Sequence, residues 1–100
     1  MTQLMLVHSR AKEGRDAEYA AWYTGTHIGE VTQVPGFNSG RFHACTGPDG
    51  QPTGEYAAAY EVADEAPPAL MQKLMAASAT MNISDAIDGA SVKFTFLTPV

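Results

Sequence analysis

The stretch that decides the fold is EYAAWYTGTHIGEVTQVPGF, from Glu18 to Phe37. Its apolar residues recur at steps of three and four, which is typical of the buried face of an amphipathic helix. We expect this helix to begin at about Asp16, which suits a helix N-terminus, and to run to about Gln33. Pro35 ends it, because the residue before a proline is disfavoured in the α conformation. The buried face then carries Ala20, Tyr23, His27, Val31 and Val34.

Two glycines, Gly25 and Gly29, lie four residues apart inside this helix. Each destabilises a helix interior by about 1 kcal/mol relative to alanine. Their presence indicates either that another part of the protein packs closely against the helix, or that the helix loosens at this point.

The rest of the chain shows strand patterns in four segments, which are residues 4–9, 37–44, 55–62 and 91–97. Residues 46–54 are rich in Gly, Pro and Asp, which predicts a hairpin loop. The segment 55–62 contains three alanines, which favour a helix. Its polar and apolar residues nevertheless alternate after the loop, so we expect a strand.

A second helix is expected after the third strand. Asp64 is placed at or near its N-cap, with Pro67 and Pro68 in the first turn, where proline is tolerated. The helix is expected to fray by Asn82, with one further turn within residues 84–88.

This order of elements, β-α-β-β-α-β, predicts a single ferredoxin-like α+β domain over residues 1–100. Such a domain has a four-stranded antiparallel sheet with both helices on one face. Leu4 and Leu6 alternate with Met5 and Val7, so both faces of the first strand are apolar. Because the helices cover only one face, we expect a homodimer through the free face of the sheet. An amphipathic sheet with a few exposed apolar residues is the alternative.

Composition excludes several classes of function. The net charge is −5 and the six basic residues are scattered, which argues against a nucleic-acid partner. The single cysteine, Cys45, rules out an internal disulfide and favours a reducing compartment. The N-terminal apolar run is too short for a signal peptide or a membrane span, so we expect a soluble, cytoplasmic protein. The motifs of common hydrolases, NTPases, dinucleotide enzymes and zincins are absent from the sequence.

The chain resembles the dimeric α+β barrel superfamily and, within it, the EthD-like branch. The similarity lies in the aromatic pair Trp22-Tyr23, the following His27, the turn Val34-Pro35-Gly36-Phe37 and the order of elements. It departs from the branch after the histidine, where Ile28-Gly29 replaces an apolar-Pro pair. The resemblance implies a homodimer whose sheets face each other as a barrel, with a pocket in each subunit between its own sheet and helices. The superfamily includes polyketide cyclases, muconolactone isomerases, quinone-forming monooxygenases, dehydratases and chlorite-type haem proteins.

His27 is the first candidate for chemistry, because an imidazole can accept and return a proton near neutral pH. Helical spacing places Tyr23 four residues before it and Glu30 three residues after it. Glu30 could orient the ring, and Tyr23 could bind a substrate oxygen. The alternative is a buried histidine that bonds to a backbone carbonyl near the end of the helix.

Other residues are candidates for substrate binding, and each could equally be ordinary core or surface. Aromatic side chains that could line a pocket are Trp22, Tyr56, Tyr60, Phe94 and Phe96. Arg41 could bind a carboxylate or an enolate. His8, on a central strand, could approach His27 if it faces the helices, whereas His43 lies on an edge strand. The three histidines lack close metal-ligand spacing, so we expect neither a metal nor a cofactor.

Together these features predict a small dimeric protein that binds a hydrophobic, aromatic or polyketide-like molecule between its sheet and helices. With His27 as general acid and base, it would act as a cofactor-independent isomerase, cyclase or lyase. A cofactor-independent monooxygenase and a non-catalytic binding or structural protein are the alternatives.

Overall fold

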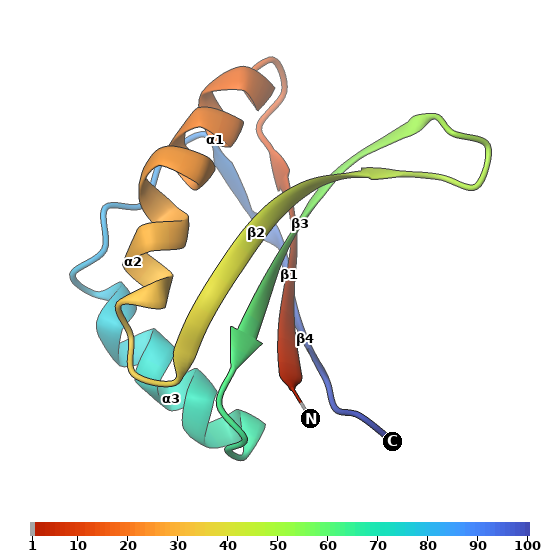
Figure 1. The fold of residues 1–100 in the computed structure, drawn as a ribbon. Coiled ribbons are helices and arrows are strands. Elements are labelled where there is room, and N and C mark those ends of the chain that lie inside the picture. The colour runs from red at the N-terminus through yellow and green to blue at the C-terminus, as the bar shows by residue number, and fades with distance from the viewer. Residues whose placement is uncertain (1) are drawn as a thin grey trace.

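The computed structural model describes residues 2–100 and confirms the expected order of elements. Strand β1 (Gln3–Ala11) is followed by a helical segment made of α1 (Asp16–Trp22), η1 (Tyr23–His27) and α2 (Ile28–Thr32). Strands β2 (Phe37–Thr46) and β3 (Pro52–Val62) form a hairpin, and α3 (Pro67–Ser78) precedes β4 (Ile87–Leu97). The helices cover one face of a four-stranded antiparallel sheet, which is the ferredoxin-like α+β fold (Figure 1).

The register of the sheet defines which residues face the helices. The strands lie in the order β2-β3-β1-β4. Met5 on β1 is paired with Tyr60 on β3 and Phe96 on β4. Paired residues share a face of the sheet, and both Met5 and Tyr60 are 0% exposed. This face therefore forms the core beneath the helices, and the residues that alternate with it, such as Leu4 and Leu6, lie on the uncovered face.

The first helical segment covers the expected residues but is not a uniform α-helix. The backbone N–H of Ile28 donates to the carbonyl of Tyr23, five residues earlier, so the middle turn is π-helical. A Cβ at Gly25 or Gly29 would meet nothing within 4 Å. Of the two alternatives for these glycines, the loosened helix is therefore correct within the protomer. Gly36, with φ of 97°, then supplies the left-handed turn that leads into β2.

Helix α3 is shorter than its sequence indicates, because it begins later in the chain and ends earlier. Ala66, not Asp64, is its N-cap residue, because Pro67 and Pro68 occupy the first turn. The helix ends at Ser78 instead of fraying by Asn82. The turn expected within residues 84–88 is a single turn outside the helix, in which the backbone N–H of Ile87 donates to the Ser84 carbonyl at 3.5 Å. It ends at Ile87, which already pairs with Ala11 of β1.

The strands are longer than expected because antiparallel pairing continues beyond the apolar residues. Strands β2 and β3 extend into the predicted loop 46–54, where Thr46 pairs with Pro52. Figure 1 shows this hairpin projecting beyond the rest of the sheet. Strand β4 begins at Ile87, four residues before the predicted start at Ser91, because Ile87 and Asp88 extend the ladder with β1.

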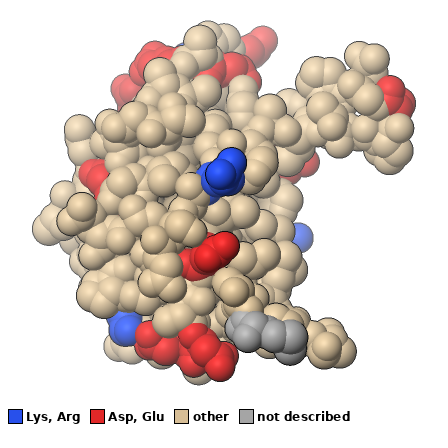
Figure 2. All heavy atoms as spheres, in the orientation of Figure 1, with Lys and Arg blue, Asp and Glu red and all other residues tan. Residues whose placement is uncertain are grey.

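The surface carries no large cluster of basic side chains on the face seen in Figure 2. Lys and Arg are isolated there, and the acidic side chains gather mainly toward the two ends of the molecule (Figure 2). Within residues 2–100, no helix is both long enough and apolar enough to cross a membrane.

Candidate functional site

The candidate site is a small apolar cavity between the helices and the covered face of the sheet. Its volume is about 160 Å³. Met5 and Val7 of β1, Leu74 of α3 and Phe94 of β4 contribute to its walls. Met75 lies on its open side and is 48% exposed. The cavity therefore has a hydrophobic interior and opens to solvent beside Met75.

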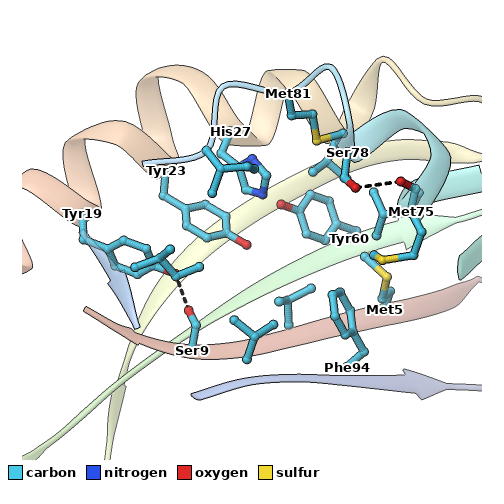
Figure 3. A pocket seen from close by; sticks show the side chains of 16 residues that line it. Met5, Ser9, Tyr19, Tyr23, His27, Tyr60, Met75, Ser78, Met81 and Phe94 are labelled. Atoms are coloured by element: carbon cyan, nitrogen blue, oxygen red, sulfur yellow. Dashed lines mark hydrogen bonds between the residues drawn. The ribbon is translucent and has the colours of Figure 1, made fainter. Parts of the chain in front are cut away.

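Three polar side chains converge at one end of this cavity. The hydroxyl groups of Tyr23 and Tyr60 point toward each other, and the imidazole of His27 lies beside them (Figure 3). Tyr23 and His27 come from the π-helical turn η1, and Tyr60 comes from β3. The fold thus places two hydroxyl groups and one imidazole next to one another in the cavity wall.

His27 is held in place on two sides. Its Nδ1 atom lies 3.2 Å from Oε1 of Glu30. Its ring stacks on Trp22, with centroids 4.5 Å apart, and meets the edge of Tyr23 at 4.9 Å. Burial lowers the pKa of His27, and Glu30 opposes that shift. The ring is therefore mainly neutral at pH 7.

Glu30 and Trp22 also fix the segment that follows α3. The backbone N–H of Asn82 donates to Oε2 of Glu30 at 2.6 Å, and the indole N–H of Trp22 donates to the Asn82 carbonyl at 2.8 Å. Glu30 therefore bridges His27 and the chain beside the cavity, where Met81 and Ile83 contribute to its lining. A carboxylate that already accepts a backbone hydrogen bond has little freedom to leave the imidazole.

Tyr60 has an unsatisfied hydroxyl. Its ring is fully buried, and its hydroxyl has no hydrogen-bond partner among the residues that the structure describes. Burial raises the pKa of Tyr60, and burial raises the pKa of Tyr23 to about 12. The two hydroxyls influence each other's pKa. Because both pKa values are raised, both hydroxyls are protonated at neutral pH. The Tyr60 hydroxyl nevertheless forms no hydrogen bond of normal geometry with Tyr23.

The position of Tyr60 depends on a glycine in the neighbouring strand. Gly40 of β2 pairs with Tyr60 of β3. A Cβ at Gly40 would lie 2.6 Å from both Cδ1 and Cε1 of the Tyr60 ring. Only glycine leaves room for the ring to lie flat over β2.

Two residues that the sequence did not single out as candidates also line the cavity, and they form a hydrogen bond with each other. Ser9 of β1 is buried, and its hydroxyl lies 2.5 Å from that of Tyr19. Both residues line the cavity. A serine within an apolar strand is a weak signal, but its alternation with Met5 and Val7 places it on the covered face.

The structure brings together six of the predicted site residues: His27, Tyr23, Glu30, Trp22, Tyr60 and Phe94. Glu30 and Trp22 contact His27 without lining the cavity. Tyr56 lies beyond the cavity, where its hydroxyl donates to Asp16 at 2.8 Å. Phe96 packs at the edge of the core and also lies outside the cavity lining.

His8 and Arg41 lie elsewhere, because their strands turn them to the uncovered face of the sheet. His8 falls between Val7 and Ser9, which line the cavity, and it pairs with Ala57 and Lys93. Arg41 pairs with Ala59 on the same uncovered face. Neither residue contacts His27 within the protomer. Among residues 2–100, no three side chains of His, Cys, Asp or Glu converge as a metal site would require.

Comparison with known proteins identifies the fold but not the activity. No family model matches the chain, and no curated protein sequence matches it. An EthD family protein from Bacillus halodurans aligns over 100% of both chains with a TM-score of 0.65 and 14% identity. An uncharacterised NIPSNAP domain protein from Burkholderia xenovorans aligns over 98% of this chain and 94% of its own, with a TM-score of 0.61 and 17% identity.

A protein of unknown function from Nitrosomonas europaea is a third similar structure. It covers 96% of this chain and 86% of its own, with a TM-score of 0.55 and 19% identity. The chain therefore has the ferredoxin-like α+β fold that it shares with an EthD family protein and a NIPSNAP domain protein, in agreement with the resemblance seen in the sequence.

Proposed function

We propose that the protein is a cofactor-independent acid/base catalyst of the isomerase, cyclase or lyase type, acting on a hydrophobic or aromatic small molecule. The observation that carries the proposal is the position of His27. Its imidazole lies between the Glu30 carboxylate and an apolar cavity that also holds two tyrosine hydroxyls.

The contact with Glu30 determines which nitrogen of His27 acts as the base. A carboxylate accepts hydrogen bonds and cannot donate them, so the proton of the neutral ring belongs on Nδ1. The lone pair is then on Nε2, the other ring nitrogen. Because burial lowers the pKa of His27, this base is free to accept a proton at neutral pH. Once the ring is protonated, the carboxylate 3.2 Å away stabilises the imidazolium.

The simplest reaction for this arrangement is proton transfer next to a carbonyl group. Nε2 of His27 takes a proton from the carbon beside the carbonyl, and the electron pair of that C–H bond forms an enolate. The protonated hydroxyls of Tyr60 and Tyr23 donate hydrogen bonds to the enolate oxygen. When a C=C bond adjoins that carbon, the enolate is a conjugated dienolate, and the imidazolium returns the proton to its far carbon. The double bond has then moved into conjugation with the carbonyl, without any oxidant or cofactor.

We further propose that two copies pair through the uncovered face of the sheet, as the resemblance implies. Leu97 is 43% exposed there, and it pairs with Leu4 across the β1–β4 ladder. Leu6 pairs with Ala59 on β3, so the apolar surface continues across the centre of the sheet. A second copy of this face would bury these side chains.

The catalytic proposal can be tested with 3-cyclohexen-1-one, a small ketone whose isomerisation to 2-cyclohexen-1-one is followed by ultraviolet absorbance. We expect the wild-type protein to accelerate this reaction and His27→Ala to slow it by about 100-fold or more, which is typical of a lost general base. His43→Ala is the matched control, because His43 is exposed and lies outside the cavity, with its Nδ1 atom 3.2 Å from the Ala57 carbonyl. Equal rates for wild-type protein and His27→Ala would refute the assigned role.

The same experiment separates the proposal from a purely binding role. The ketone could raise the melting temperature of a correctly folded wild-type protein without being isomerised. That result would favour a non-catalytic binder. Glu30→Gln gives a second test, because the amide no longer requires the proton on Nδ1. We expect this variant to lose part of kcat while retaining its affinity for the ketone.

A further inference from the structure

The cavity also carries information about the charge and size of its ligand. Its volume is about 160 Å³. An apolar cavity of about 150 Å³ is large enough to bind benzene. The enclosed space therefore accepts one six-membered ring, and any larger part of a ligand must extend past Met75 and Ile83 on the open side.

The cavity has no cation to pair with an anionic ligand. None of the six Lys and Arg side chains, all within the described residues, lines it. Three of them pair with acidic groups elsewhere: Arg10 with Glu55, Arg15 with Glu18 and Asp85, and Lys73 with Glu65. Arg41 and Lys93 lie on the uncovered face, and Lys12 is exposed in the turn after β1.

The local charges make the cavity unfavourable for a carboxylate. Glu30 places a negative charge 3.2 Å behind the His27 ring. A carboxylate in the cavity would be removed from water beside a neutral His27 and with no Lys or Arg to pair with, which is strongly unfavourable. The earlier expectation that Arg41 recognises a carboxylate cannot apply to this cavity, because Arg41 lies on the other face of the sheet.

The polar end of the cavity nevertheless requires one oxygen atom. The buried hydroxyl of Tyr60 has no partner among residues 2–100, although such groups are nearly always hydrogen-bonded. His27 offers an acceptor nitrogen beside it (Figure 3). A ligand hydroxyl could accept a hydrogen bond from Tyr60 and donate one to His27, and a carbonyl could accept from Tyr60.

We propose that the cavity is specific for an uncharged one-ring group with a single hydroxyl or carbonyl oxygen, bound by the hydroxyl of Tyr60, and that it excludes ring carboxylates. This inference rests on the proposed function only in placing the ligand in the same cavity. It concerns binding and does not require turnover.

Four compounds of similar shape test the proposal: 4-methylphenol, toluene, 4-methylbenzamide and 4-methylbenzoate. Their affinities are measured near neutral pH by ligand-observed NMR titration. We expect 4-methylbenzoate to bind at least about tenfold more weakly than 4-methylbenzamide, which has the same size without the charge. Equal affinities for this pair, or failure of all four compounds to bind, would overturn the proposal.

Tyr60→Phe tests the bound oxygen. The change removes only the unsatisfied hydroxyl, so the variant should fold at least as stably as wild type. We expect its affinity for 4-methylphenol to fall about fivefold while its affinity for toluene is unchanged. If the ratio of the affinities for 4-methylphenol and toluene is the same in Tyr60→Phe as in wild type, Tyr60 does not bind the oxygen. If 3-cyclohexen-1-one is not isomerised but both binding preferences are observed, the catalytic proposal fails and this one stands.

Discussion

The sharpest test of the site is the change Gly40→Ala in strand β2. The new Cβ would lie 2.6 Å from two carbons of the Tyr60 ring, well inside the 3.4 Å at which ordinary contact begins. The ring must therefore move by about 0.8 Å or more, and the space open to it is the cavity on its other side. Overpacking of this kind destabilises a protein by about 1–3 kcal/mol. The adjacent cavity relieves part of the clash, so we expect a value near the lower end.

The effect on function should be larger than the effect on stability. A loss of 1 kcal/mol lowers the melting temperature of a domain of this size by about 4–8 °C, which differential scanning calorimetry resolves. A displacement of about 1 Å in a catalytic group can reduce the rate by about 100-fold, and the displaced ring also fills part of the cavity. Isomerisation of 3-cyclohexen-1-one and binding of 4-methylphenol should therefore both fall by at least about tenfold.

Gly89→Ala is the matched control for this change. Gly89 is an exposed glycine in a strand, and a Cβ there would meet nothing within 4 Å. It should leave stability and binding unchanged. A Gly40→Ala protein with the melting temperature and 4-methylphenol affinity of the wild type would show that the Tyr60 ring does not lie over Gly40, and the description of the polar end of the cavity would then be wrong.

Three further predictions follow from the helix and the sheet. Burial lowers the folded-state pKa of His27 below its ordinary value of 6.5, so the unfolded chain binds the proton more readily. The free energy of unfolding should therefore fall as the pH drops through 6.5 and level off below the folded-state pKa. Denaturant titrations of wild type and His27→Asn at several pH values check this. The free energy of unfolding of the variant should not show the pH dependence that His27 causes. Gly29→Ala, at an exposed helical position with open space around it, should stabilise the protein by about 0.5–1 kcal/mol in urea, and a loss of stability would indicate that a partner covers this surface. Leu6→Asp, on the uncovered face, should yield a folded monomer by analytical ultracentrifugation, whereas a persistent dimer would place the interface elsewhere.

Local sequence patterns predicted the elements of this fold better than their lengths. The three-and-four spacing of apolar residues and the Pro-Gly turn were sufficient to place the first helix, because both act within a few residues. Strand length depends on a partner that is distant in sequence. Ile87 belongs to β4 because Ala11 is available to pair with it, and nothing near Ile87 indicates this. The end of α3 at Ser78 likewise depends on where the following segment is held, by Trp22 and Glu30 through Asn82.

The sequence likewise predicted only those parts of the candidate site whose residues are close together in the chain. Tyr23, His27 and Glu30 lie within eight residues, so helical spacing was enough to group them. The side to which His8 points could not be predicted, because Leu4, Met5, Leu6 and Val7 are all apolar and give no phase to the alternation. The open hydroxyl of Tyr60 depends on Gly40 in the neighbouring strand, a pairing that arises only when the sheet forms.

The π-helical turn explains why the helix that positions His27, the proposed base, contains a destabilising glycine. In a regular α-helix each residue turns by about 100°, so side chains five positions apart point about 140° away from each other. Trp22 and His27 are five residues apart, yet their rings stack at 4.5 Å. The wider turn at Tyr23–His27 brings them to the same side, so that Trp22 covers one face of the imidazole while Glu30 holds its Nδ1 atom. Gly25 lies inside that turn, where the helical hydrogen-bond pattern is already interrupted. The glycine is therefore better understood as part of the geometry that orients His27 than as a defect in the helix, in agreement with the frequent occurrence of π-helical turns at functional sites.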